Sequence, residues 1–315
     1  MRKGNGTMGS LSKKKKGRLS SLAVFLLVFL VFLLVFGGLC LWMVVKINQE
    51  RREAGVSAPA AESATSQSIA FTSEDERDLF LVTVDEEAQG FVAVHTDPAN
   101  ARIRTLAIPR DTLVEVGTAE KRLFEVYASD GARQAQEAVS RLIGLTFDNY
   151  AVLTYDKAET LLGKLDKGVL FTIPEDLNYQ SETPGESIQL RGGLTSLTAS
   201  QVVSVLRYPT WNGGRKQQAD VQAQLASAVI NQYLVADRDL QADFDNFVGL
   251  LQSDIKISHF IAAKPGLEYL AARNTGSICA SVSLDGQYTG SGEAMAFRMA
   301  DDAPAKLEAV FGNEP

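Results

Sequence analysis

One pentapeptide in this sequence of 315 residues has the composition of an anion site, Ile108-Pro109-Arg110-Asp111-Thr112. It follows a run of apolar and β-branched residues, and Pro109 has no N–H for a strand ladder, so a strand is expected to end here. Arg110 and Asp111 then project from the end of a sheet, where ligand clefts form. Because the chain after residue 52 is acidic, any phosphate site in it must be a local arginine pocket. An Arg–Asp pair in a surface turn is the alternative.

A second group of polar residues surrounds the junction of two predicted helices. Arg207 ends the first helix and Arg215 opens the second. Helical spacing puts Gln218 and Gln222 on the same side as Arg215 and the apolar Leu225, so polar groups extend an inward stripe. Polar groups on an inward face need partners. Either they line a wet or anionic cavity, or the first turns of this helix protrude beyond the core.

A third candidate is Asp85, which ends the run LFLVTVD. A carboxylate at the end of a strand is suited to hold a divalent cation for phosphoryl chemistry. A plain turn residue before Glu86 and Glu87 is the alternative.

The elements that must position these residues alternate along the chain. Helical periodicity between the strands, with Gly144 as a stop signal, predicts an α/β domain with a central mixed sheet flanked by helices. The predicted strands cover residues 79–84, 91–96, 102–108, 150–154 and 169–173, and the predicted helices cover 132–143, 198–206 and 215–235.

An uncharged, mostly aliphatic stretch of 27 residues precedes this domain, between Arg18 and Lys46. At 1.5 Å per residue it forms a helix of roughly 40 Å, which is enough to cross a membrane. Seven Lys or Arg precede it and three follow it, so the positive-inside rule places the N-terminus in the cytoplasm. A cleaved signal peptide, with Ala58-Pro59-Ala60 as a cleavage site, is the alternative. We expect a cytoplasmic tail (1–18), a transmembrane helix (19–46), a stalk (47–72) and an extracytoplasmic domain (73–315).

Charge and composition exclude several classes. Residues 1–52 contain ten Lys or Arg and one acid, which gives them a net charge of +9. The whole chain has a net charge of −7, so residues 53–315 carry −16. A body this acidic is unsuited to nucleic acid, whose binding needs clustered cations. Two cysteines and two histidines, widely separated, argue against a thiolate- or histidine-based metal site, and no motif supports a hydrolytic triad.

Taken in order, these features are similar to a known family. A basic tail, a single span and a stalk are followed by a strand ending in Asp, by IPRDT, by DNYAVLTYDKAETLLGKL, by IQLRGGLTSLTASQVVSVLRYP and by a Gln-rich helix. This order resembles the LytR-CpsA-Psr family of bacterial envelope proteins over roughly residues 75–235. The resemblance implies an α/β domain enclosing an apolar pocket for a polyprenyl chain, with the (pyro)phosphate under an arginine cluster beside a divalent cation, usually Mg²⁺.

The resemblance also implies an activity and roles for single residues. Family members transfer glycopolymers such as teichoic acid or capsule from polyprenyl pyrophosphate to peptidoglycan. Arg110 matches the phosphate-contacting arginine of the IPRD motif, Asp111 its neighbour, and Arg207 the first arginine of an R-Y-R motif. Asp85 matches a metal-associated aspartate. The resemblance places Arg215 near a further family arginine, and Gln218 and Gln222 are expected beside it in the ligand site.

This sequence departs from the family pattern at the same sites. The segment between the first two strands is short (Glu86 to Gly90), with Gln89 nearest to a second metal-associated aspartate, and Pro209 replaces the second arginine of R-Y-R. Three functions remain open. One is an active Mg²⁺-dependent glycopolymer phosphotransferase, and another is a binding module that holds polyprenyl phosphate, wall polymer or a partner protein without turnover. The third is an extracytoplasmic sensor or adaptor.

Overall fold

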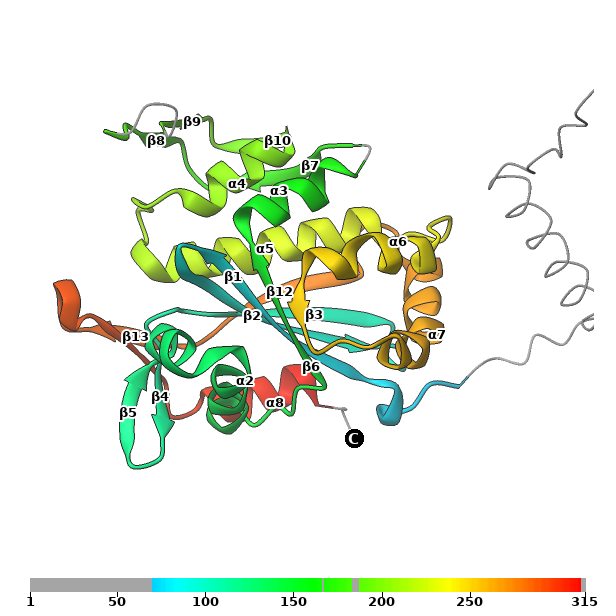
Figure 1. The fold of residues 1–315 in the computed structure, drawn as a ribbon, viewed down its shortest axis with the longest axis horizontal. Coiled ribbons are helices and arrows are strands. Elements are labelled where there is room, and N and C mark those ends of the chain that lie inside the picture. The colour runs from blue at the N-terminus through cyan, green and yellow to red at the C-terminus, as the bar shows by residue number, and fades with distance from the viewer. Residues whose placement is uncertain (1–69, 166, 183–186, 313–315) are drawn as a thin grey trace, which may run out of the picture. The chain divides into compact units, whose positions relative to one another are not determined.

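The computed structural model describes residues 70–165, 167–182 and 187–312. At their centre lies a six-stranded mixed sheet in the order β11-β6-β1-β2-β3-β12 (Figure 1). Its strands are β1 (Arg77–Asp85), β2 (Glu87–Asp97), β3 (Arg102–Ile108), β6 (Asn149–Thr154), β11 (Gln252–Ser253) and β12 (Cys279–Ser283). β1, β2 and β3 form antiparallel hairpins, while β6 lies parallel to β1 and β12 parallel to β3. The predicted α/β class with a central mixed sheet is confirmed.

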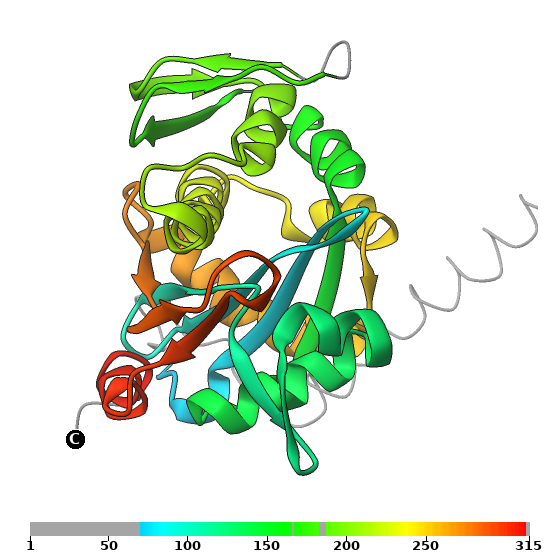
Figure 2. The same cartoon turned by 90° about the vertical axis from the view of Figure 1, so that its left-hand side faces the viewer.

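The two faces of this sheet carry different cores. Phe80 and Val82 of β1 point to one face, where they pack against α2 (Leu123–Ile143) and α8 (Ala303–Phe311). The opposite face is covered by α5 (Gly214–Tyr233), whose Ala219 and Ala223 pack on Val92 and neighbouring strand residues. Side chains alternate along a strand, so Leu79, Leu81 and Thr83 of β1 belong to the α5 face. Figure 2 shows the layers from the side.

The predicted helices are present with shifted starts. α2 begins at Leu123, nine residues before the predicted start, and Gly131 (φ 81°) divides it, so the predicted 132–143 is its second part. Gly144 ends it in the left-handed conformation with φ 76°, as its sequence position predicted. Thr198 caps α4 (Ala199–Arg207) by accepting a hydrogen bond from the backbone of Gln201.

A smaller apolar cluster lies above α5. It joins α3 (Tyr155–Gly163), β7 (Val169–Ile173), β10 (Gly193–Leu197) and α4 to one side of α5, with Tyr155, Tyr208 and Trp211 among its buried members. The remaining elements are η1 (Ser73–Asp75), β4 (Leu113–Val116), β5 (Ala119–Arg122), β8 (Leu177–Tyr179), β9 (Ile188–Leu190), α6 (Leu240–Phe247), η2 (Val248–Leu250), α7 (Ile257–Arg273), β13 (Gly286–Thr289), η3 (Gly292–Ala294) and β14 (Ala296–Met299).

The predicted tail (1–18), span (19–46) and all but the last three residues of the stalk (47–72) lie outside the described residues. Within the described part of the chain, no helix has the length and hydropathy needed to cross a bilayer.

Candidate functional site

The hairpin between β1 and β2 forms the base of the site. β1 ends at Asp85, Glu86 makes the turn with φ 59°, and Glu87 already pairs with Asp85 across the hairpin. The ladder shifts register between Thr83 and Val84, which leaves Gln89 beside the end of β1. The Gln89 amide donates a hydrogen bond to the Asp85 carbonyl oxygen at 3.2 Å. The short segment between the strands therefore gathers Asp85, Glu87 and Gln89 at one edge of the sheet.

Arg207 reaches this hairpin from the end of α4. Its Nε and Nη2 atoms donate to the two carboxylate oxygens of Asp85 at 2.8 and 3.0 Å. The hydrogen bond to Asp85 raises the pKa of Arg207, so the guanidinium stays charged. The Arg207 side chain is still 42% exposed, which leaves donors available to a ligand. Its guanidinium carbon also lies 5.7 Å from the centre of the Tyr155 ring.

Arg110 reaches the same hairpin from the end of β3. Its Nη1 donates to Gln89 Oε1 at 2.9 Å and its Nη2 to Glu87 at 2.8 Å. The guanidinium carbon stacks 4.5 Å from the centre of the Phe124 ring. Arg110 Nε is buried and finds no hydrogen-bond acceptor among the residues that the structure describes. The structure thus brings Arg110 and Arg207, which are far apart in the sequence, onto one hairpin through Glu87, Gln89 and Asp85.

Asp111 and Arg215 form a separate pair beside this hairpin. Asp111 is completely buried, and it accepts a hydrogen bond from Arg215 at 2.6 Å. The Tyr288 hydroxyl lies 3.5 Å from the other Asp111 oxygen, and burial together with the Asp111 charge raises the pKa of Tyr288. A buried carboxylate needs such partners. Asp111 therefore fixes the start of α5 through Arg215, while Arg110 next to it turns toward the hairpin.

Gln222 contacts the hairpin from the middle of α5. Its amide donates to the Gln89 carbonyl oxygen at 3.3 Å, and its Oε1 is buried without a partner among the described residues. Gly90 permits this approach, because a Cβ built there would lie 1.8 Å from Gln222 Oε1 and 2.7 Å from Thr83 Oγ1. Gln218 lies one turn earlier on α5 and is half-buried.

Tyr155 is a site residue that the sequence reasoning missed. It opens α3 directly after β6 and is almost fully buried. Its hydroxyl donates to the Leu206 carbonyl oxygen at 3.2 Å, which fixes the end of α4 and so the base of Arg207. Burial and the nearby Asp85 charge raise its pKa. Tyr155 directly follows the predicted strand 150–154. The same kind of position, at the end of a predicted strand, identified Arg110 as a candidate and could have identified Tyr155.

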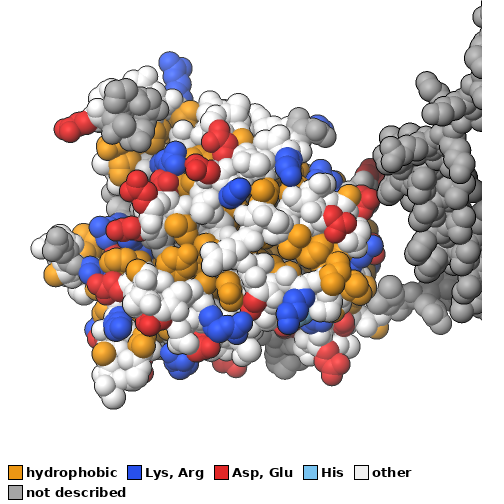
Figure 3. All heavy atoms as spheres, viewed as in Figure 1, with side chains coloured by type: hydrophobic (Ala, Val, Ile, Leu, Met, Phe, Trp, Pro, Cys, Tyr) orange, Lys and Arg blue, Asp and Glu red, His pale blue; other side chains and the backbone are white. Residues whose placement is uncertain are grey.

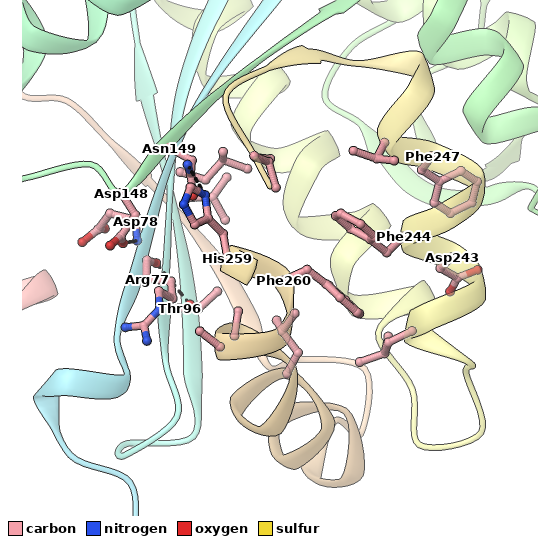
Figure 4. A pocket seen from close by; sticks show the side chains of 18 of the residues that line it. Arg77, Asp78, Thr96, Asp148, Asn149, Asp243, Phe244, Phe247, His259 and Phe260 are labelled. Atoms are coloured by element: carbon pink, nitrogen blue, oxygen red, sulfur yellow. Dashed lines mark hydrogen bonds between the residues drawn. The ribbon is translucent and has the colours of Figure 1, made fainter. Parts of the chain in front are cut away.

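An apolar cavity of about 740 Å³ lies further along the same face of the sheet. Leu79 and Val94 of the sheet line it, with Leu234 at the end of α5, Phe244 of α6 and Phe260 of α7 (Figure 4). Leu79 and Asp85 are six residues apart on β1, which is roughly 20 Å in a strand. The cavity and the two arginines therefore lie at opposite ends of one face of the sheet.

The donor set near Asp85 does not form a protein-built cation site. Both Asp85 oxygens accept hydrogen bonds from Arg207, and Gln89 stands where the resemblance places a second aspartate. In the described part of the chain, no group of three or more Asp, Glu, His or Cys side chains is arranged to hold a metal. Mg²⁺ at Asp85 stays a prediction from the resemblance, and no chemical step is assigned to it.

Fold and site together define an α/β domain with two features on one face of its central sheet. Two arginines meet on a hairpin at one end of this face, and an apolar cavity lies at the opposite end. Known proteins share this fold. The sequence matches the model of the LytR_cpsA_psr family over residues 43–293. The chain belongs to the LytR-CpsA-Psr family.

Solved structures agree with this membership at the level of the fold. A crystal structure described as a putative transcription regulator from Eubacterium siraeum is 14% identical, with a TM-score of 0.70, and the match covers 82% of this chain and 99% of that one. TagV of B. subtilis is 16% identical, with a TM-score of 0.63 and coverage of 76% and 98%. TagT of B. subtilis is 18% identical, with a TM-score of 0.60 and coverage of 81% and 98%, and TagT has also been solved bound to LIIa-WTA. No curated protein matches the sequence. Family and fold together indicate a function related to cell-wall glycopolymers.

Proposed function

We propose that this protein is anchored in the membrane with its folded domain outside the cytoplasm, and that it binds a polyprenyl-linked envelope glycopolymer through the (pyro)phosphate. The observation that carries the proposal is the meeting of Arg110 and Arg207 on the β1–β2 hairpin. The 27-residue apolar stretch and its flanking charges support the anchor and its orientation.

The arginine pair is preorganised for an anion. Each guanidinium is already held by a carboxylate, Arg110 by Glu87 and Arg207 by Asp85, so neither has to be ordered when a ligand arrives. The Glu87 side chain is 69% exposed, and an exposed ion pair contributes only about 0.2–1 kcal/mol. A phosphate group with more than one charge can replace Glu87 at Arg110 at little cost, and it can share Arg207 with Asp85.

The cavity suits the hydrocarbon part of the same ligand. Its walls are mainly Leu, Val, Ile and Phe side chains, and it lies on the same face of the sheet as the arginines. Burying apolar surface there contributes about 25 cal/mol per Å². Ala219 and Ala223 of α5 pack on this face between the hairpin and the cavity, so a lipid with its phosphate at the hairpin would reach the cavity around this helix.

Transfer of the polymer to peptidoglycan is the second candidate function, and the position of the arginines favours it. In this reaction an acceptor hydroxyl attacks the phosphorus that bears the polymer, the bond from this phosphorus to the bridging oxygen breaks, and polyprenyl phosphate leaves with the electron pair. The proton of the acceptor hydroxyl passes to the leaving phosphate, and the polymer is then joined to the acceptor through a phosphodiester. Arg110 and Arg207 would stabilise the charge that develops on the phosphoryl oxygens.

Binding of farnesyl pyrophosphate to the full-length protein in lipid nanodiscs tests the proposal. Arg110→Ala and Arg207→Ala each remove charge-assisted hydrogen bonds of about 1.5–3 kcal/mol, so each should weaken binding about 10- to 150-fold. Arg141→Ala is the matched control, because Arg141 lies exposed on α2 and contacts the Glu115 carbonyl oxygen instead.

Two outcomes separate the candidate functions. Affinity that is equal in the wild type and both arginine variants would overturn the proposed site. Formation of a peptidoglycan-linked product from a lipid-linked polymer, lost in the same variants, would establish transfer, whereas tight binding without product would establish a binding module.

A further inference from the structure

Two large isoleucine side chains are exposed at the start of α7. Ile257 is 51% exposed and Ile261 is 60% exposed, and they lie one helical turn apart on the same side. Among the described residues, the only other large apolar side chains with comparable exposure are Leu170 and Leu194, which lie on β7 and β10 above α5. We call Ile257 and Ile261 the α7 isoleucine pair.

This pair lies beside the wall of the apolar cavity. Ser258 and Ala262, each the next residue after one isoleucine, line the cavity. On the other side the cavity is lined by α6 and η2, in which no residue is buried although Phe244, Phe247 and Val248 are apolar. Orange apolar side chains gather on this side of the molecule in Figure 3. Partly covered apolar surface therefore surrounds the cavity from two elements.

The chain enters the folded domain at the same helix. The Phe71 ring lies 4.7 Å from the Tyr269 ring near the end of α7. Only 24 residues separate this point from Lys46, where the predicted membrane span ends. For an unstructured linker of 24 residues the average span is roughly 25–30 Å. With the proposed anchor inserted, a linker of this length would hold the entry point near the bilayer.

We propose that the start of α7 docks on the outer leaflet of the membrane, with the α7 isoleucine pair in the interfacial layer, so that the cavity beside it meets the lipid phase. Exposed Lys256 directly before the pair would face the phosphate groups of the lipid head groups. The proposal goes beyond the binding of a glycopolymer. It rests on the membrane anchor and not on what the arginines bind.

Fluorescence of a single label tests this docking in the full-length protein reconstituted in phosphatidylglycerol–phosphatidylethanolamine vesicles. Cys40→Ser removes one native thiol, and the Cys279 side chain is buried, with its pKa raised by that burial, so we expect it to react far more slowly than an exposed introduced cysteine. Ile261→Cys then carries an environment-sensitive nitrobenzoxadiazole label. Leu194→Cys is the matched control, since Leu194 is 69% exposed at the other end of the domain.

We expect blue-shifted emission for the label at position 261, with at least twofold stronger quenching by nitroxide-bearing lipids than at position 194. Equal and weak quenching at both positions would overturn the proposal. A label at 261 that is shielded from aqueous iodide but not quenched by nitroxide lipids would also overturn it, because a protein surface would then cover the pair. Neither readout depends on farnesyl pyrophosphate, so failure here is distinguishable from failure of the proposed polymer site.

Discussion

The Asp85→Asn substitution separates two roles for this carboxylate. Both of its oxygens accept hydrogen bonds from Arg207, at 2.8 and 3.0 Å, in a pair whose side chains are 42% and 32% exposed. An ion pair of this exposure contributes about 0.2–1 kcal/mol. An anion that shares Arg207 must compete with that interaction, so asparagine should strengthen binding of farnesyl pyrophosphate about 1.4- to 5-fold.

The assay is a titration of full-length protein with farnesyl pyrophosphate, once with EDTA and once with Mg²⁺. Asp156→Asn is the control, because its carboxylate is 93% exposed and lies 4.0 Å from Arg207, so its loss should change the affinity very little. The reasoning is refuted if the wild type binds only with Mg²⁺ and Asp85→Asn abolishes that binding, since Asp85 would then be a metal ligand and not a competitor for Arg207.

Two further predictions concern the hairpin β1–β2 and its far end. Gly90→Ala puts a Cβ 1.8 Å from Gln222 Oε1 and should lower the free energy of unfolding by about 1–3 kcal/mol in urea denaturation. Gln222→Ala in the same chain should restore only part of it, because Thr83 Oγ1 still lies 2.7 Å from the new Cβ, and an unchanged single variant would contradict the packing. Burial raises the pKa of Asp97, but hydrogen bonds from Asn100 and Arg102 outweigh this effect and hold it below the ordinary 3.8. The ionised Asp97 therefore stabilises the fold fully above pH 3.8 and loses this effect as the pH falls through its lowered pKa, so Asp97→Asn should make the unfolding free energy less acid-dependent, and an identical pH profile would show that Asp97 does not contribute.

Local patterns predicted four of the six strands of the central sheet, β1, β2, β3 and β6, and the helices α4, α5 and the second part of α2, but not β11, β12 or α8. The strands at 102–108 and 169–173 have the predicted bounds, because β-branched and apolar runs there end at clear turn signals. α6 and α7 were missed for a physical reason. No residue of the short helix α6 is buried, and Pro265 interrupts the pattern of α7, although Phe260 and Leu270 of that helix are buried.

The candidate site was predictable only as a set of sheet-end and helix-end residues. Arg110 and Asp85 follow strands, so their position at an edge could be inferred, but the pairing of Asp85 with Arg207 depends on β6 lying beside β1 and on α4 packing over α3. The complete burial of Asp111 could not be foreseen either, because its partners Arg215 and Tyr288 come from α5 and β13. Long-range topology, and not residue type, decided these contacts.

The turn of the hairpin β1–β2 consists of Glu86 alone. A one-residue turn cannot lengthen without moving its neighbours. An inserted residue would therefore move Glu87 and Gln89 relative to Arg110, while the ion pair of Asp85 with Arg207 could stay in place. Loop length at this one point therefore sets the spacing between the two guanidinium groups that we propose to share one anion.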